Sequence, residues 1–409
     1  MDRADIVHGN FLRRVAANEL PTGAAPKSGL DPYTAVEIYR AQLTSRALDI
    51  TSRRMQKEGQ GFYTIGSSGH EGMAAVARAL RPNDIAFLHY RDAAFQLARA
   101  DQVTGQTMTW DMLLSFACST DDPISGGRHK VLGSKDLFIP PQTSTIASHL
   151  PKALGAAYSL GTARRHAPEH RQLPEDGIAI CSFGDASANH STAQGAFNAA
   201  GWSSVQSAPL PLLFVCEDNG IGISTKTPHG WIAASMKHRP GVKYFEANGL
   251  DIYDTYAVTQ EAAAYVRSRK KPAFLHLKMV RLYGHAGPDV ATTYLPKSEV
   301  EQDEANDPLL HSVRLLRDDG ALSVERALKM YNQTQKRVDT LSHEAVKRPR
   351  LSSASQIMES IIPPARGCKP SNGVDTDARS IAFGKELKTQ TSPQTMGKLI
   401  NWALTDLML

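Results

Sequence analysis

The sequence predicts an α/β fold built on a mostly parallel sheet with helices on both faces. Three runs have strand character: IAICSF at 178–183, PLLFVCE at 211–217 and AFLHLKMV at 273–280. Each run is apolar throughout, which is typical of strands that are buried on both faces of a parallel sheet. They alternate with helical segments such as LPKALGAAYSLGTARR at 150–165, so the chain follows the order of an α/β protein.

The overall composition is that of an ordinary globular protein. The chain has 409 residues, 41% of them hydrophobic and 21% charged, which is enough for one large or two medium domains. The net charge of +5 comes without a long basic tract interleaved with aromatic residues, so neither nucleic acid nor a membrane surface is expected as the main partner. No stretch approaches the roughly 20 apolar residues of a membrane span. The N-terminus also lacks the apolar segment of a signal peptide.

The cysteines indicate a reducing compartment. Cys118, Cys181, Cys216 and Cys368 are widely spaced, and two of them lie inside the apolar strand-like runs. Buried free thiols fit this pattern better than a disulfide framework does. We therefore expect a cytoplasmic protein.

Composition divides the chain into four stretches. Residues 1–30 form an N-terminal arm that ends in prolines and glycines, and residues 31–350 form the body. Residues 351–393 are rich in serine, proline and glycine and are expected to be a linker. In residues 394–409 the apolar positions follow helical spacing, with Ser392 predicted as the N-cap and Pro393 in the first turn. This helix could dock on the body or on a partner.

Polar residues at the ends of two predicted strands suggest a metal site. Asp185 follows the run at 178–183, and Asn219 follows the run at 211–217, 34 positions later with one helix between them. The carboxyl ends of parallel strands meet at one edge of the sheet, where ligands of such folds bind. A carboxylate, an amide oxygen and a carbonyl of the following Gly-Ile-Gly turn would suit magnesium. The small residues Gly184, Ala186 and Ser187 would let the backbone approach a diphosphate.

Other interpretations of these residues stay open on the pattern alone. Asp185 could simply cap a strand end, with an unrelated Asn-Gly turn at Asn219. The same two side chains could also hold a metal for phosphate-ester hydrolysis. A chain that keeps the fold could, finally, be a non-catalytic scaffold.

The two motifs GDASAN at 184–189 and EDNGIGIS at 217–224 together resemble the thiamine-diphosphate signature. Residues 35–345 resemble the alpha chain of the thiamine-dependent component of 2-oxo acid dehydrogenase complexes. Four further segments carry the resemblance in the family's order: FYTIGSSGHEGMAAVARAL at 62–80, FLHYRDAAFQLARA at 87–100, TSTIASHLPKALGAAYSLG at 143–161 and VRLYGHAGPDVATTY at 280–294. The resemblance implies the thiamine-diphosphate-binding fold.

The resemblance also implies a role for each candidate residue. The magnesium ligands would be the side chains of Asp185 and Asn219 and the carbonyl of Ile221. The residues that contact thiamine diphosphate would be Tyr90, Arg91, Gly184, Ala186 and Ser187 on the diphosphate side, and Ser144 and Ile146 on the aminopyrimidine side. Asn219 would contact the cofactor as well as the metal. Arginine suits the first group because its guanidinium is a forked and permanently charged donor.

His285 is the catalytic candidate, and we expect it also to contact the cofactor. Histidine exchanges a proton near neutral pH, and the segment after the run at 273–280 could bring it to the cofactor. The resemblance implies that it donates a proton during acyl transfer. Ala286 stands where regulated family members have a serine, so control by phosphorylation at that position is not expected.

The resemblance implies partners and a substrate class. The segment TMGKLINWALTDLML at 395–409 is similar to the opening helix of the beta chain, which some bacteria fuse behind the alpha chain. We therefore expect the alpha half of a fused form that needs a beta chain for activity. A lipoyl-bearing acyltransferase would accept the acyl group, and alpha chains would self-associate. The favoured substrate is 2-oxoisovalerate, with pyruvate or acetoin dehydrogenase as alternatives.

Overall fold

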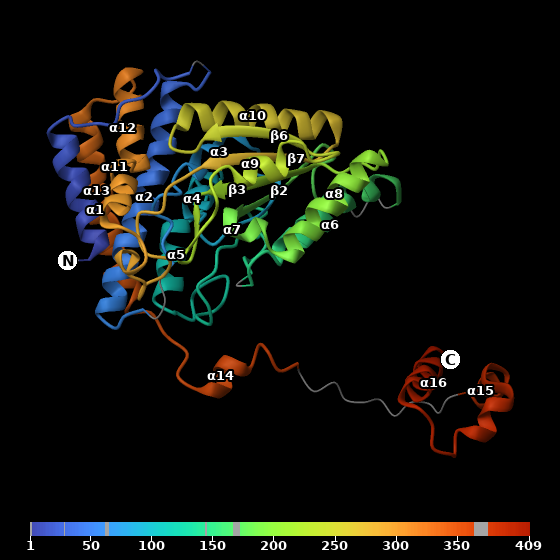
Figure 1. Ribbon diagram of the computed structural model, residues 1–409. Coiled ribbons are helices and arrows are strands. Elements are labelled where there is room, and N and C mark those ends of the chain that lie inside the picture. Colours follow the sequence, from blue (N-terminus) through green and yellow to red (C-terminus); the bar gives the residue numbers. More distant parts are fainter. Residues whose placement is uncertain (1, 28, 62–64, 144, 167–171, 364–374) are drawn as a thin grey trace. The chain divides into compact units, whose positions relative to one another are not determined.

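Five parallel strands lie at the centre of the first part of the chain (Figure 1). The computed structural model describes all residues except 1, 28, 62–64, 144, 167–171 and 364–374. The described chain forms two compact units, residues 1–351 and residues 352–409.

The sheet of the first unit has the order β1-β2-β3-β7-β6, and all its neighbours are parallel. The strands are β1 (Ile85–Phe87), β2 (Ala179–Gly184), β3 (Leu212–Asp218), β7 (Ala273–Lys278) and β6 (Lys243–Asn248). In β2 every residue is buried, as are all but the last of β3. This confirms the predicted α/β fold with a parallel sheet.

Successive residues of the central strands face two different cores, because side chains alternate across a sheet. Ile180, Leu213 and Val215 belong to a core that includes residues of α10 (Ile252–Arg269) and α3 (Met73–Ala79). Phe183, Phe214 and their neighbours belong to a second core with residues of α6 (His149–His166) and α8 (Ser191–Val205). Helices therefore cover both faces, with α10 on one side and α6 and α8 on the other (Figure 1).

A group of helices extends the first core beyond the sheet. Its members are α1 (Arg3–Ala16), α2 (Pro32–Lys57), α4 (Ala93–Ala100), α5 (Met108–Phe116), α12 (Pro308–Asp318) and α13 (Val324–Ala345). The longest, α2, begins with Asp31 as N-cap and Pro32 in its first turn, which suits a helix start. The N-terminal residues take part as well, since Phe11 of α1 is fully buried and stacks on Tyr331 of α13 at 4.3 Å between ring centroids.

Short elements connect the strands at the carboxyl edge of the sheet. They are α7 (Asp185–Ala188), β4 (Ile221–Gly222), β5 (Thr225–Lys226), α9 (Trp231–Met236), a 3₁₀ turn at Ala291–Thr293 and α11 (Lys297–Ala305). β4 and β5 pair as a small antiparallel hairpin directly after β3. Of the predicted site residues, Asp185, Ala186, Ser187 and Ile221 lie on these elements.

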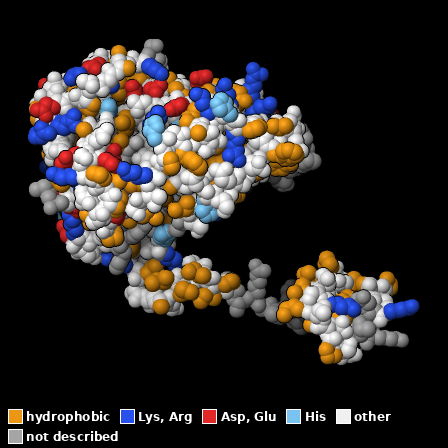
Figure 2. All heavy atoms as spheres, viewed as in Figure 1, with side chains coloured by type: hydrophobic (Ala, Val, Ile, Leu, Met, Phe, Trp, Pro, Cys, Tyr) orange, Lys and Arg blue, Asp and Glu red, His pale blue; other side chains and the backbone are white. Residues whose placement is uncertain are grey.

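The second unit contains α14 (Ala354–Met358), α15 (Thr376–Phe383), a 3₁₀ helix at Gly384–Thr389 and α16 (Met396–Met408). Hydrophobic side chains are exposed over α14 and the residues that follow it (Figure 2). Trp402 of α16 is buried, and Asp406 accepts a hydrogen bond of 2.7 Å from Arg379 of α15. The apolar side chains of α16 at 396, 399, 400, 404, 407 and 408 are exposed.

The start of the last helix differs from the prediction. Thr395, not Ser392, is the N-cap of α16, and Pro393 lies outside the helix. The helical spacing of apolar residues predicted the helix but gave too early a start, because Pro393 suits a bend before a helix as well as a first turn. Within the described residues, no helix is long and apolar enough to cross a membrane.

Candidate cofactor site at the carboxyl edge of the sheet

The ends of β2 and β3 bring the two predicted metal ligands together. Gly184 pairs with Glu217 in the sheet, so Asp185 and Asn219 leave adjacent strands at nearly the same level. The Asp185 side chain is buried and accepts hydrogen bonds from the Thr227 hydroxyl and from the backbone N–H of Asn219. Burial raises the pKa of Asp185 to about 6, although the bond from Thr227 opposes this shift.

The Gly-Ile-Gly turn lies against the same site. Asn219 Oδ1 accepts the backbone N–H of Ile221 at 3.1 Å, which folds the turn back toward β3. A Cβ atom at Gly222 would come within 2.3 Å of Ala186 Cβ, so only glycine fits between the hairpin and α7. The structure thus brings the residues of the expected magnesium site, Asp185, Asn219 and Ile221, into one place.

The small residues expected to line the diphosphate occupy the same corner. Gly184 ends β2, and Ala186 and Ser187 follow in α7. Gly184 and Ser187 are buried, whereas Ala186 is exposed. Thr227 was not predicted, because nothing in the sequence pattern shows that its hydroxyl reaches Asp185.

A second set of predicted residues follows β1. Arg91 is buried and donates to the carbonyl of Gly66 at 2.5 Å and to the carbonyl of His285 at 3.1 Å. The rings of Tyr90 and His285 meet edge to face with their centroids 6.2 Å apart. Tyr90, Arg91 and His285 therefore form one group, although the third is nearly 200 positions away in sequence.

The imidazole of His285 is held in a positively charged environment. Asp289 accepts the backbone N–H of His285 at 2.5 Å, and this bond shapes the loop. Burial and the charges of Arg91 and Arg281 lower the pKa of His285 to about 4. The ring is therefore neutral at pH 7 and can accept a proton or donate its own N–H.

A cavity of about 340 Å³ adjoins this group. It is lined by Tyr90, Ile146 and His285 together with mainly apolar side chains from α2, α5 and the segment at 129–132. Ile146, predicted to touch the aminopyrimidine, thus lines the same cavity as His285. Ser144, predicted for the same role, lies outside the described residues.

Lys130 brings a cation into this cavity, and the sequence analysis missed it. Its Nζ donates to the carbonyl of Ile65 at 2.8 Å and lies 4.6 Å from the centroid of the Phe116 ring. Burial lowers the pKa of Lys130 to about 8. In sequence it is one of many lysines, so only its position in the fold distinguishes it.

A buried polar network lies beneath the site, and it was not predicted from the sequence. Glu217 of β3 is within 2.6 Å of His70 Nδ1 and 3.2 Å of His89 Nδ1. Burial lowers the pKa of His89 to about 3 and raises that of Glu217 to about 8. The three side chains offer atoms within 4.8 Å of one another, as metal ligands would. Their separations are hydrogen-bond lengths, however, so we interpret the group as a hydrogen-bonded network.

Residues 39–353 match the protein family described as "Dehydrogenase E1 component". The chain belongs to this family. The protein named 2-oxoisovalerate dehydrogenase subunit alpha of Bacillus subtilis is 28% identical over 337 residues, covering 80% of this chain and 96% of that protein. The mitochondrial protein of the same name from Caenorhabditis elegans is 25% identical over 327 residues, 78% of this chain and 71% of the relative. These similarities confirm the resemblance to the alpha chains of the family.

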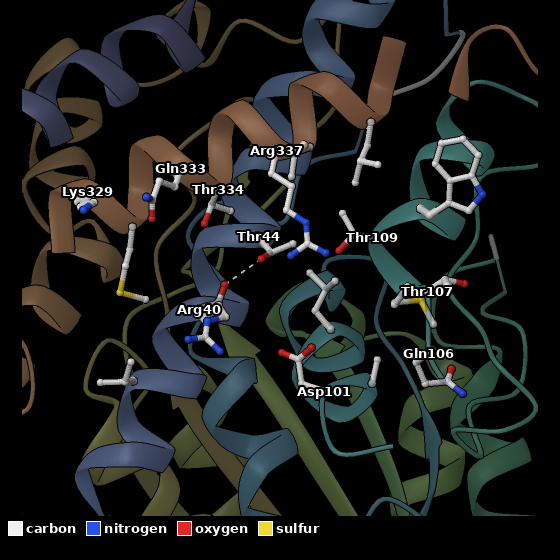
Figure 3. A pocket seen from close by; sticks show the side chains of 18 of the residues that line it. Arg40, Thr44, Asp101, Gln106, Thr107, Thr109, Lys329, Gln333, Thr334 and Arg337 are labelled. Atoms are coloured by element: carbon white, nitrogen blue, oxygen red, sulfur yellow. Dashed lines mark hydrogen bonds between the residues drawn. The ribbon is translucent and has the colours of Figure 1, made fainter. Parts of the chain in front are cut away.

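This E1 chain also has a larger cavity away from the predicted site. It measures about 1040 Å³ and is lined by residues of α2, the segment at 97–110 and α13, among them Arg40, Asp101, Lys329 and Arg337 (Figure 3). None of the predicted cofactor residues lines it. Size alone would therefore point to a place with no predicted chemistry, and the strand ends are the better guide to the site.

Proposed function

We propose that this E1 chain is the alpha subunit of a 2-oxo acid dehydrogenase, which binds thiamine diphosphate and magnesium for oxidative decarboxylation and for acyl transfer to a lipoyl group. One observation carries the proposal: Asp185 and Asn219 meet at adjacent strand ends, and Tyr90, Arg91 and His285 form a second group on the same carboxyl side of the strands. The family membership supports thiamine dependence.

The residues present fit a magnesium ion. Asp185 and Asn219 offer a carboxylate and an amide oxygen, and the carbonyl of Ile221 would be the third ligand. Hard oxygen donors are the ligands that magnesium prefers. The raised pKa of Asp185 fits as well, because a buried carboxylate without a counter-charge favours a bound cation.

The residues around the expected cofactor would have different roles. Thiamine diphosphate, when bound, supplies the nucleophile and the electron sink for decarboxylation. Arg91 and Tyr90 would hold its diphosphate, with Gly184, Ala186 and Ser187 against it, and Ser144 and Ile146 would contact the aminopyrimidine. The neutral imidazole of His285 would move a proton during acyl transfer.

We favour 2-oxoisovalerate as the substrate. The similar proteins bear that name, and the cavity beside His285 is lined by apolar side chains of Leu48, Met112, Phe116 and Leu132 that suit a branched aliphatic group. Pyruvate or acetoin dehydrogenase activity are the alternatives. The ammonium of Lys130 would face the carboxylate of a 2-oxo acid.

The proposed partners are a beta chain of the same enzyme, a lipoyl-bearing acyltransferase and a second alpha chain. We propose a cytoplasmic location, because Cys181 and Cys216, which are buried in the central strands, are free thiols. We also propose that residues 394–409 begin a beta-chain-like segment after a linker at 351–393, and that residues 1–30 and 31–350 are the arm and the cofactor-binding domain.

Calorimetry with thiamine diphosphate and magnesium tests the proposal. The wild-type chain should bind the cofactor only when magnesium is present, and Asp185→Ala should abolish this binding while the fold persists. The exposed Asp136→Ala is the matched control and should bind as the wild type does. Carbon dioxide release from 2-oxoisovalerate should then require added beta chain. Wild-type, magnesium-dependent affinity in Asp185→Ala would overturn the assignment of the metal site.

A further inference from the structure

An asparagine that binds a metal ion must present the correct end of its amide. Only Oδ1 of Asn219 has lone pairs for a cation, whereas Nδ2 carries two hydrogens that repel one. The two ends have nearly the same shape, so packing alone does not choose between them. Hydrogen-bond partners must make that choice.

The backbone of Ile221 fixes one end of the amide. Its N–H lies 3.1 Å from Asn219 Oδ1, and a backbone N–H can only donate. The oxygen therefore faces the turn, on the side where the expected ligands Asp185 and Ile221 lie. The nitrogen must face the other way.

His70 receives the other end. Its Nε2 lies 2.9 Å from Asn219 Nδ2, and since Nδ2 is a donor, Nε2 must be the acceptor. A neutral imidazole that accepts at Nε2 carries its proton on Nδ1. That proton points to Glu217, whose Oε2 is 2.6 Å away.

The surroundings of His70 hold its side chain in this arrangement. The side chains of His70 and Glu217 are fully buried, so water does not replace either partner. The segment before His70 is pinned, because a Cβ at Gly69 would lie 2.0 Å from the carbonyl oxygen of Val280. Glu71, which follows, accepts the N–H of Gly69 at 2.7 Å and pairs with Arg46 at 2.7 Å.

We propose that His70 is a positioning residue that turns the amide oxygen of Asn219 toward the magnesium site. The inference rests on the proposed function, since it takes Asn219 as a ligand. Glu217 fixes the tautomer of His70, and His70 fixes the amide. Comparable partners behind the ligands of other metal sites change metal affinity about 10- to 100-fold when they are removed.

The test is a magnesium titration of the full chain at saturating thiamine diphosphate, read by calorimetry. His70→Leu removes the acceptor and should weaken magnesium binding about 10- to 100-fold. His70→Gln can still accept through its amide oxygen and should recover most of the affinity. His311→Leu replaces another buried histidine, in α12, and should leave magnesium binding unchanged.

The same substitution in a chain that carries Asn219→Asp distinguishes a loss of positioning from a general loss of structure. In Asn219→Asp both carboxylate oxygens are equivalent, so the ligand needs no orientation. Adding His70→Leu to Asn219→Asp should therefore cause no further loss, whereas adding it to the wild type should. Circular dichroism and thermal unfolding of each variant show whether it has folded.

The possible outcomes are distinct. Unchanged magnesium affinity in His70→Leu would overturn the inference, and so would an equal loss in both backgrounds. If the wild-type chain showed no magnesium-dependent binding of thiamine diphosphate, the proposed function itself would fail, and the inference with it.

Discussion

At the scale of single residues, Lys130 is the charge most open to a direct test. Its ammonium is present below a pKa of about 8, which burial has lowered, and is lost as the pH rises through that value. An anionic 2-oxo acid should therefore bind more weakly above pH 8. We expect a loss of about 10- to 150-fold, the usual contribution of one hydrogen bond to a charged group.

Binding of 2-oxoisovalerate to the thiamine-free chain, measured from pH 6 to pH 9.5, checks this prediction. Lys130→Met should bind weakly at all pH values and show no step near pH 8. This variant is needed because Glu217 also titrates at about 8. Lys135→Met is the control. Lys135 is exposed and follows Lys130 closely in sequence, and this variant should keep the decrease in binding near pH 8. A step of the same size in Lys130→Met would assign it to another group.

His285 should be needed for acyl transfer and not for holding the cofactor. The diphosphate would be held by Arg91, Tyr90 and the metal, so His285→Ala should keep the affinity for thiamine diphosphate within a few fold. Transfer of the acyl group to a lipoyl acceptor, assayed with a beta chain present, should fall by about 10²- to 10⁴-fold, as expected for a lost proton-transfer group. Unchanged transfer would remove His285 from the mechanism.

Sequence could predict residues whose position follows from the strand order, and few others. Asp185 and Asn219 were accessible because each directly follows an apolar run, and parallel strands end at one edge. Thr227, Lys130 and His70 lie on connections whose paths depend on tertiary contacts. No local pattern marks Thr227 or Lys130. His70, His89 and Glu217 lie within segments that resemble the family, but the sequence does not show that their side chains meet.

At the scale of elements, a buried ion triad ties three segments together. Arg46 of α2 pairs with Glu71 at 2.7 Å and binds both oxygens of Asp307, next to α12, at 2.8 and 2.9 Å. All three side chains are almost fully buried. Removing the guanidinium would leave two buried carboxylates without a counter-charge.

Arg46→Ala should therefore lower the free energy of unfolding by about 3–5 kcal/mol, the cost typical of breaking a buried pair. Urea unfolding followed by circular dichroism measures it. Arg81→Ala is the matched control, because Arg81 pairs with Asp176 where both side chains are half exposed. That change should cost about 1 kcal/mol or less. Equal losses in the two variants would mean that burial does not decide the contribution of these pairs.

The elements themselves were predictable to different degrees. The runs that became β2, β3 and β7 are apolar throughout, and the structure has all three as neighbours in the sheet. The edge strands were missed. β1 has three residues, and β6 alternates between buried and exposed side chains, so neither forms a long apolar run.

At the scale of the whole molecule, the two units should separate by proteolysis. Residues 352–363 are exposed throughout, and the apolar side chains of Ile357, Met358 and Ile361 are accessible to thermolysin. We expect cleavage there to release a stable fragment that ends near 351, because exposed segments without buried side chains, such as α14 and its flanks, are cut first. Mass spectrometry of a timed digest identifies the fragment.

The released body should keep its magnesium-dependent binding of thiamine diphosphate, since every described candidate residue lies before 351. Calorimetry on the purified fragment measures it. If the body unfolded once residues 352–409 were removed, the second unit would contribute to its stability, contrary to this expectation.

The register of the central strands also limits where residues can be inserted into this chain or deleted from it. Gly184 lies level with Glu217, so deleting one codon anywhere within 212–218 would move Asn219 by about 3.3 Å and reverse which core each side chain faces. In the connection at 206–208, between α8 and β3, residues 206 and 207 are exposed and 208 is half-buried, and none of them is a site residue. Descendants of this sequence should gain and lose residues at that connection, while the spacing from 178 to 185 and from 212 to 219 stays constant.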